Sequence, residues 1–173
     1  MDVEKIKAKL LAKKKAPVIK GSDYLSTGST LLDLACSDSI KGGLLKGKFY
    51  FFVGDSSSGK TWLSMTCLAE AAINPNFNDY RFIYDNGEDG ALMDIEKYFG
   101  KAVARRLESP AKDSDGNPVH STSVEEFYYH VDDAIKAGKP FIYILDSMDS
   151  LSSDDEISKF TEAKEAHRKG KEV

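Results

Sequence analysis

The sequence is poor in cysteine and has no long apolar run. Its two cysteines, Cys36 and Cys67, have neither a disulfide-framework nor a metal-binding spacing. We therefore expect both to be reduced core residues of a cytoplasmic protein. No apolar stretch approaches the roughly 20 residues of a membrane-spanning helix, and the N-terminus lacks the apolar core of a signal peptide. These absences argue against a disulfide-stapled, metal-finger or membrane-spanning protein.

Composition indicates a globular protein with uneven charge. At 173 residues, 41% hydrophobic and 30% charged, one well-packed domain is expected. The net charge is −4, but the seven lysines of residues 1–20 outweigh Asp2 and Glu4 by five, which leaves −9 for the remainder. We expect a basic N-terminal helix or arm over residues 1–20 and a core domain over residues 21–173. The arm is either a surface for nucleic acid or a neighbouring subunit, or a solvated helix.

The most informative motif follows five apolar or aromatic residues, 49–53. Such a run is typical of a strand buried on both faces of a sheet. Residues 54–61 read G-x-x-x-x-G-K-T, the spacing of a phosphate-binding loop. A helix that begins near Thr61 would turn its positive end toward the same phosphates. The sequence therefore predicts a nucleoside triphosphate site, and the alternative is a Gly/Ser-rich surface turn.

Each position in the loop has a physical reason. Backbone N–H groups must point inward to bind phosphate, and Gly54 and Gly59 allow the backbone angles and close approach that this requires. Lys60 can reach the β- and γ-phosphates, and the hydroxyl of Thr61 can ligate Mg²⁺. The expected phosphate-binding residues are those of the whole loop: Gly54, Asp55, Ser56, Ser57, Ser58, Gly59, Lys60 and Thr61.

Three sequence blocks together resemble a known family. They are S-T-G-S-x-x-L-D-x-A at 26–35, G-G-L-x-x-G at 42–47 and G-x-x-x-S-G-K-T at 54–61. In this order they resemble the ATPase core of RecA/RadA recombinases, and the phage-type RecA-like proteins more than bacterial RecA itself. The resemblance implies an α/β P-loop NTPase fold, with a RecA-like parallel sheet covered by helices on both faces. It also implies ATP and Mg²⁺ as cofactors, single-stranded DNA as partner and a homo-oligomer or filament.

Two acids follow the second expected strand, residues 80–84. In RecA-like proteins this strand ends in a carboxylate, usually Glu, which orients the water that attacks the γ-phosphate. Here Glu88 comes three residues after Asp85, where two is usual in the family. We expect Glu88 to have this catalytic role, alongside Lys60, and keep Asp85 as the alternative. A third interpretation is that both acids only line a solvated turn.

The third apolar run, residues 140–145, ends in Asp146. An apolar strand closed by a carboxylate is the Walker B pattern, and Asp146 is expected to hold Mg²⁺ through a water, opposite Thr61. D-S-x-x-x-L at 146–151 is also the form that the RecA family gives this motif.

The remaining elements are expected from periodicity and turn chemistry. Helices are predicted over residues 62–76 and 91–107, after a capping box at 123–126, and in the polar stretch after Leu151. Residues 112–118 are predicted to form an exposed turn.

The function expected from the family resemblance is ATP hydrolysis coupled to work on single-stranded DNA in homologous recombination and repair, hence a DNA-dependent ATPase. Three alternatives stay open. They are a RecA-fold helicase or loader ATPase, a P-loop kinase of a small molecule, and a nucleotide-gated binding module without turnover. A P-loop kinase usually has an arginine-rich lid after the Walker B strand, where this chain has only Arg168.

A further expectation concerns a strand that is missing. In the RecA-like sheet, a strand later in the chain lies between the phosphate-loop strand and the Walker B strand. The residues after Leu151 are polar and helix-like, so the core is expected to be incomplete at the C-terminus. The isolated chain is then expected to be marginally stable or to associate, to hydrolyse ATP poorly and to lack strand exchange. The alternative is that residues 49–53 pair directly with residues 141–145.

Overall fold

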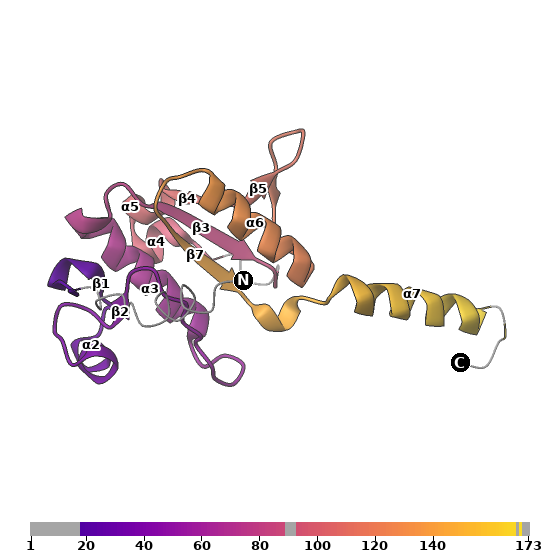
Figure 1. Cartoon of the computed structure of the whole chain (residues 1–173), viewed down its shortest axis with the longest axis horizontal. Coiled ribbons are helices and arrows are strands. Elements are labelled where there is room, and N and C mark those ends of the chain that lie inside the picture. Colours follow the sequence, from indigo (N-terminus) through magenta and orange to yellow (C-terminus); the bar gives the residue numbers. More distant parts are fainter. Residues whose placement is uncertain (1–17, 89–92, 169, 171–173) are drawn as a thin grey trace, which may run out of the picture.

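The computed structural model describes residues 18–88, 93–168 and 170 of the chain. The predicted basic arm lies almost wholly outside these residues. The elements, shown in Figure 1, are β1 (Tyr24–Leu25), α2 (Thr30–Ser37), β2 (Leu44–Leu45), α3 (Lys60–Ile73), β3 (Arg81–Asn86), α4 (Ile95–Phe99), α5 (Lys101–Ala104), β4 (Leu107–Glu108), β5 (Ala111–Lys112), β6 (Pro118–Val119), α6 (Val124–Lys136), β7 (Phe141–Asp146) and α7 (Asp154–Arg168).

The central sheet is parallel, with the strand order β4-β3-β7. β3 and β7 pair along their whole length, from Arg81 opposite Phe141 to Asn86 opposite Asp146. The second and third expected strands are therefore confirmed. The predicted turn at 112–118 joins the short antiparallel pair β5 and β6, and β1 and β2 form another such pair.

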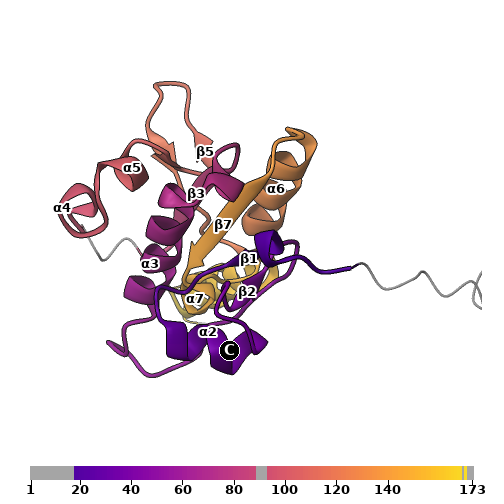
Figure 2. The same cartoon turned by 90° about the vertical axis from the view of Figure 1, so that its left-hand side faces the viewer.

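Helices cover both faces of the sheet. α3 supplies the buried Met65, Leu68 and Ala71 to a core that also takes in β3 and β7. α6 lies on the opposite face, where the Phe127 ring contacts Tyr143 at 5.6 Å. Figure 2 shows β3 and β7 between these two helices. This arrangement confirms the predicted α/β fold with a parallel sheet and two helical layers.

Helix ends follow the local sequence. Ser29 caps α2 by accepting from the N–H of Leu32, and Ser123 and Glu126 form the predicted capping box of α6. α3 ends at Ile73, before Asn74 and Pro75. α7 is exposed and projects from the body of the molecule in Figure 1, as its polar sequence predicts.

The prediction of a buried strand at residues 49–53 is wrong. These residues belong to no strand, and Phe49, Phe51 and Val53 are 86%, 76% and 92% exposed. A strand requires a hydrogen-bonded neighbour, and no described residue supplies one here. β7 likewise has no partner on its second edge within the described parts of the chain, so the direct pairing of residues 49–53 with β7, given above as the alternative, is also absent.

Two other expectations are corrected. The single helix predicted over residues 91–107 is two short helices, α4 and α5, separated by Gly100 at φ 90° and ψ 161°, and Leu107 begins β4. A residue with these angles cannot continue an α-helix. Residues 91 and 92 lie outside the described part.

Cys67 is buried as predicted, with burial raising the pKa of its thiol to about 12, but Cys36 is exposed. Neither cysteine is in a disulfide.

No helix within the described ranges has the length and apolar character needed to cross a bilayer.

Candidate functional site

The loop at residues 54–61 has the backbone form that its glycines permit. Gly59 precedes α3 with φ 92°, in the left-handed region that glycine adopts without strain. A Cβ at Gly54 would lie 2.7 Å from the Oγ of Ser58, so a larger residue there would force the Ser58 side chain to move. Lys60 Nζ donates hydrogen bonds to the carbonyls of Gly54 and Asp55, both at 2.9 Å. The loop lysine thus lies over its own loop at the start of α3.

Thr61 and Asp146 meet where the loop approaches the sheet. Thr61 Oγ1 donates to Asp146 Oδ2 at 2.7 Å, although 85 residues separate them in sequence. The hydroxyl of Tyr84 donates to the same oxygen at 2.9 Å. Burial and this hydrogen bond to Asp146 raise the pKa of Tyr84, so the phenol stays a donor at neutral pH. The first turn of α3 and the carboxyl end of β7 therefore share one polar contact.

Glu88 lies beside this contact. Its backbone N–H donates to the carbonyl of Asp146 at 3.1 Å, and its Oε1 accepts from Ser147 Oγ at 2.6 Å. The Glu88 side chain is exposed, so it is open to solvent and to a bound ligand. The structure therefore brings four predicted site residues together. Lys60 precedes Thr61 in the chain, Thr61 donates a hydrogen bond to Asp146, and Glu88 donates one to the carbonyl of Asp146.

Asp85 has a different environment. Its carboxylate is completely buried and accepts from the N–H of Ser121 at 2.8 Å, the Ser121 hydroxyl at 2.5 Å and the Tyr143 hydroxyl at 2.6 Å. Tyr143 is on the α6 side of the sheet, and burial together with Asp85 raises the pKa of its phenol. His130 extends the network through Ser121 Oγ at 2.9 Å. Asp85 is thus held inside the protein by three donors.

Sequence reasoning missed the partners of these acids. Tyr84 and Ser121 are not parts of the phosphate-loop or Walker B motifs, and Ser147, the second residue of D-S-x-x-x-L, was given no role there. Tyr84 is the β3 residue directly before Asp85. Asn86 of β3 pairs with Asp146 of β7, and this register brings the ends of the two strands together. Ser121 lies 36 residues from Asp85, and nothing in its local sequence indicates the contact.

The residues present fit a magnesium–nucleotide complex. Thr61 Oγ1 and Asp146 Oδ2, 2.7 Å apart, supply one hydroxyl and one carboxylate as possible ligands of a cation. Mg²⁺ is usually bound in this way, through one or two carboxylates, substrate phosphates and waters. An open hollow of about 460 Å³ beside the loop is lined by Phe51, Phe52, Val53, Gly54, Ser58, Gly59, Lys60 and Leu63. It places apolar side chains next to the phosphate loop.

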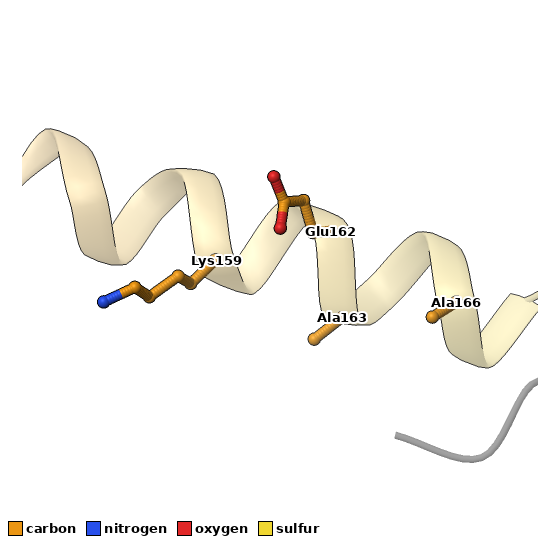
Figure 3. Close-up of a pocket in the computed structure, with 4 residues that line it drawn as sticks. All are labelled: Lys159, Glu162, Ala163 and Ala166. Carbon is orange, nitrogen blue, oxygen red and sulfur yellow. The ribbon is translucent and has the colours of Figure 1, made fainter.

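A second hollow has no connection with this site. Figure 3 shows its lining residues, Lys159, Glu162, Ala163 and Ala166, all on α7. A shallow surface formed by one exposed helix provides neither enclosure nor convergent polar groups for a small ligand.

A loop with the spacing of a phosphate-binding loop, followed by a helix and opposed by an aspartate at the carboxyl end of a parallel strand, is typical of α/β P-loop proteins. Among curated proteins, the chain is 32% identical to Protein RecA of Cytophaga hutchinsonii over 141 residues, 81% of this chain and 35% of that protein. It is 32% identical to Protein RecA of Chlorobaculum tepidum over 128 residues, 73% of this chain and 32% of that protein. The chain is therefore a RecA-like protein, and it spans about a third of the length of these relatives.

Two other comparisons found nothing. No family model matches the chain, and no solved structure matches it. The phage-type character expected from the sequence stays a prediction.

Proposed function

We propose that this chain is the nucleotide-binding part of a RecA-like, DNA-dependent ATPase that acts on single-stranded DNA in recombination and repair. The observation that carries the proposal is the Thr61–Asp146 hydrogen bond of 2.7 Å. It joins the start of α3 to the carboxyl end of β7, which is where P-loop NTPases hold Mg²⁺.

The proposed roles follow from the side chains. The backbone of residues 54–61 and the ammonium of Lys60 bind the phosphates of ATP, which replace the two loop carbonyls that Lys60 contacts in the structure. Thr61 and Asp146 would hold Mg²⁺ beside these phosphates. When bound, Mg²⁺ neutralises charge on the phosphates.

Glu88 is proposed as the residue that positions the attacking water. It is exposed and bonded to Ser147, next to Asp146, whereas Asp85 is buried and accepts three hydrogen bonds. A water-positioning carboxylate needs a free oxygen facing the substrate. These environments favour Glu88 for catalysis and a structural role for Asp85.

The roles in DNA binding and in assembly rest on the RecA relatives. Single-stranded DNA as partner and a homo-oligomer or filament as assembly are proposals for the complete RecA-like unit, of which this chain spans about a third. The lysine-rich residues 1–20 are a candidate surface for DNA or for a neighbouring subunit.

The ATPase rate of the chain, measured with and without single-stranded DNA, tests the proposal. Stimulation by DNA supports a DNA-dependent ATPase, whether recombinase, helicase or loader. Transfer of phosphate to a small-molecule acceptor would replace the proposal with a kinase. A fourth result would be that the chain binds ATP without hydrolysing it, and that Glu88→Gln gives the same ATP binding and the same absence of turnover. That result would leave only a nucleotide-gated binding module.

A further inference from the structure

Two tyrosines in the paired strands β3 and β7 each donate a hydrogen bond to an acid of the other strand. Tyr143 of β7 donates to Asp85 of β3, within the buried network described above. Tyr84 of β3 donates to Asp146 of β7 at 2.9 Å, and Thr61 bonds the same carboxylate. The two bonds lie on opposite faces of the sheet, Tyr143 on the α6 side and Tyr84 on the α3 side. Of the two tyrosines, Tyr84 is therefore the one that reaches the proposed ion site.

The strand register places the Tyr84 hydroxyl beside Asp146. Successive side chains of a strand point to opposite faces of its sheet, so Tyr84 and Asn86 share a face. Asn86 lies directly opposite Asp146 in the parallel pair. Tyr84 lies opposite Ile144, and both pack against the core on the α3 side. Packing therefore holds the tyrosine ring in place, and its hydroxyl meets the end of β7 from a fixed direction.

The hydrogen bonds of the Asp146 carboxylate leave one of its oxygens open. Among the described residues, its side-chain donors are Thr61 and Tyr84, and both bonds end on Oδ2. A carboxylate oxygen accepts about two hydrogen bonds, one at each lone-pair position. The two donors therefore occupy Oδ2, and Oδ1 remains for a cation or for a water bound to it.

The two donors differ in their relation to a bound ion. Thr61 is itself proposed to hold the ion, so its hydroxyl would have to serve the ion and Asp146 together. Tyr84 lies on β3, outside the phosphate loop and outside the lining of the hollow beside that loop. Its hydroxyl can keep the same bond to Oδ2 before and after an ion binds. Tyr84 is thus connected to the ion site through Asp146.

We propose that Tyr84 is a positioning residue of the ion site, whose hydroxyl holds Oδ2 of Asp146 and leaves Oδ1 to the cation of a nucleotide complex. The inference rests on the proposed function, because it assumes that ATP binds with Mg²⁺ at residues 54–61. A carboxylate that is fixed beforehand loses less conformational freedom when the ion binds. Removal of such an outer partner typically weakens metal binding about 10–100-fold. We expect the lower end, about tenfold, because Thr61 still donates to the same oxygen.

Binding of a non-hydrolysable ATP analogue to Tyr84→Phe tests the proposal, because this variant keeps the packed ring and loses only the hydroxyl. Dissociation constants are measured by calorimetry in excess Mg²⁺ and, separately, in EDTA. In Mg²⁺ the variant should bind about tenfold more weakly than the unmodified chain. In EDTA the two proteins should bind equally well, since the hydroxyl bonds Asp146 and not the phosphate loop. A purely structural role would change both constants by the same factor.

Tyr143→Phe is the matched control. It removes the same hydroxyl from the neighbouring strand, but that hydroxyl bonds Asp85 rather than Asp146. Both dissociation constants should stay within about twofold of those of the unmodified chain, as is usual for sites that share no partner. Urea unfolding shows whether each variant is folded.

A second variant tests whether Tyr84 acts through Asp146. In an Asp146→Ala background, Tyr84→Phe should cause no further loss of affinity in Mg²⁺, because the carboxylate that it positions is gone. A further loss of about tenfold in that background would overturn the proposal.

Two other results would refute the role of Tyr84 and leave the nucleotide site standing. One is equal affinity of Tyr84→Phe and the unmodified chain in Mg²⁺. The other is equal weakening in Mg²⁺ and in EDTA, which would assign the hydroxyl to the fold and not to the ion. Failure of the proposed function looks different, because the unmodified chain would then bind no analogue, or bind it no better in Mg²⁺ than in EDTA. The role of Tyr84 would fall with it.

Discussion

Replacing Asp85 by alanine should destabilise the protein strongly, because Asp85 organises a buried network. The substitution leaves two donors of Ser121 and one of Tyr143 without their acceptor. Each buried group left unpaired costs about 1–3 kcal/mol, and rearrangement or entry of water recovers part of the sum. We expect a loss of about 3–5 kcal/mol from a total of roughly 5–15 kcal/mol.

Urea unfolding measures this loss. With a slope of about 2 kcal/mol per molar, the midpoint should fall by roughly 1.5–2.5 M. Trp62 is the single tryptophan and contacts the rings of Tyr98 and Phe99 at 5.4 and 4.9 Å, so its fluorescence reports on tertiary packing. Asp79→Ala, at an exposed aspartate, is the control and should shift the midpoint by less than about 0.3 M.

One result would contradict the structural role of Asp85. If Asp85→Ala unfolds within about 0.3 M of the unmodified chain and yet loses ATP turnover, Asp85 is a catalytic group and its structural role is wrong.

Three further predictions concern the site and its pH dependence. Glu88→Gln should keep ATP bound and stop turnover, because shape is kept while charge and proton acceptance are lost; a single-turnover assay that shows this for Asp85→Asn and not for Glu88→Gln would reverse the assignment. Asp146→Asn should weaken Mg²⁺ binding about 10–100-fold, as loss of a group that holds the ion through a water does, and unchanged Mg²⁺ dependence of ATP binding in a titration would contradict it. Tyr143 has a raised pKa in the folded state, so its stabilising contribution is complete below the unfolded pKa of about 10 and is lost as the pH rises further. Urea midpoints should therefore fall above about pH 10, and less steeply in Tyr143→Phe; equal slopes would refute this.

Much of the fold could be predicted from the sequence, because local chemistry determines it. The capping residues Ser29 and Ser123 begin their helices, and the apolar runs of β3 and β7 form a parallel pair. The conformation of residues 49–53 could not be predicted in the same way, because they form no strand. Their composition is that of a strand, but a strand forms only with a neighbour, and composition does not reveal whether the neighbour is present.

The sequence predicts the residues of the candidate site, but not the different environments of its two acids. The positions of Lys60, Thr61 and Asp146 follow from motif spacing, and the structure places Thr61 and Asp146 in contact. The difference between Asp85 and Glu88 is one of burial and hydrogen bonding. It depends on Ser121 and Tyr143, which are distant in sequence and reach Asp85 only through the fold.

An equilibrium titration of ATP with Mg²⁺ into the full chain and into Lys60→Ala tests the central claim most directly. The ammonium of Lys60 is proposed to bind the β- and γ-phosphates, and loss of such a charged partner removes about 2 kcal/mol or more of binding free energy. The account predicts saturable binding to the unmodified chain and an affinity at least about thirtyfold weaker in Lys60→Ala. Equal affinity in the two proteins, with both shown to be folded by circular dichroism, would contradict the assignment of residues 54–61 as the nucleotide site.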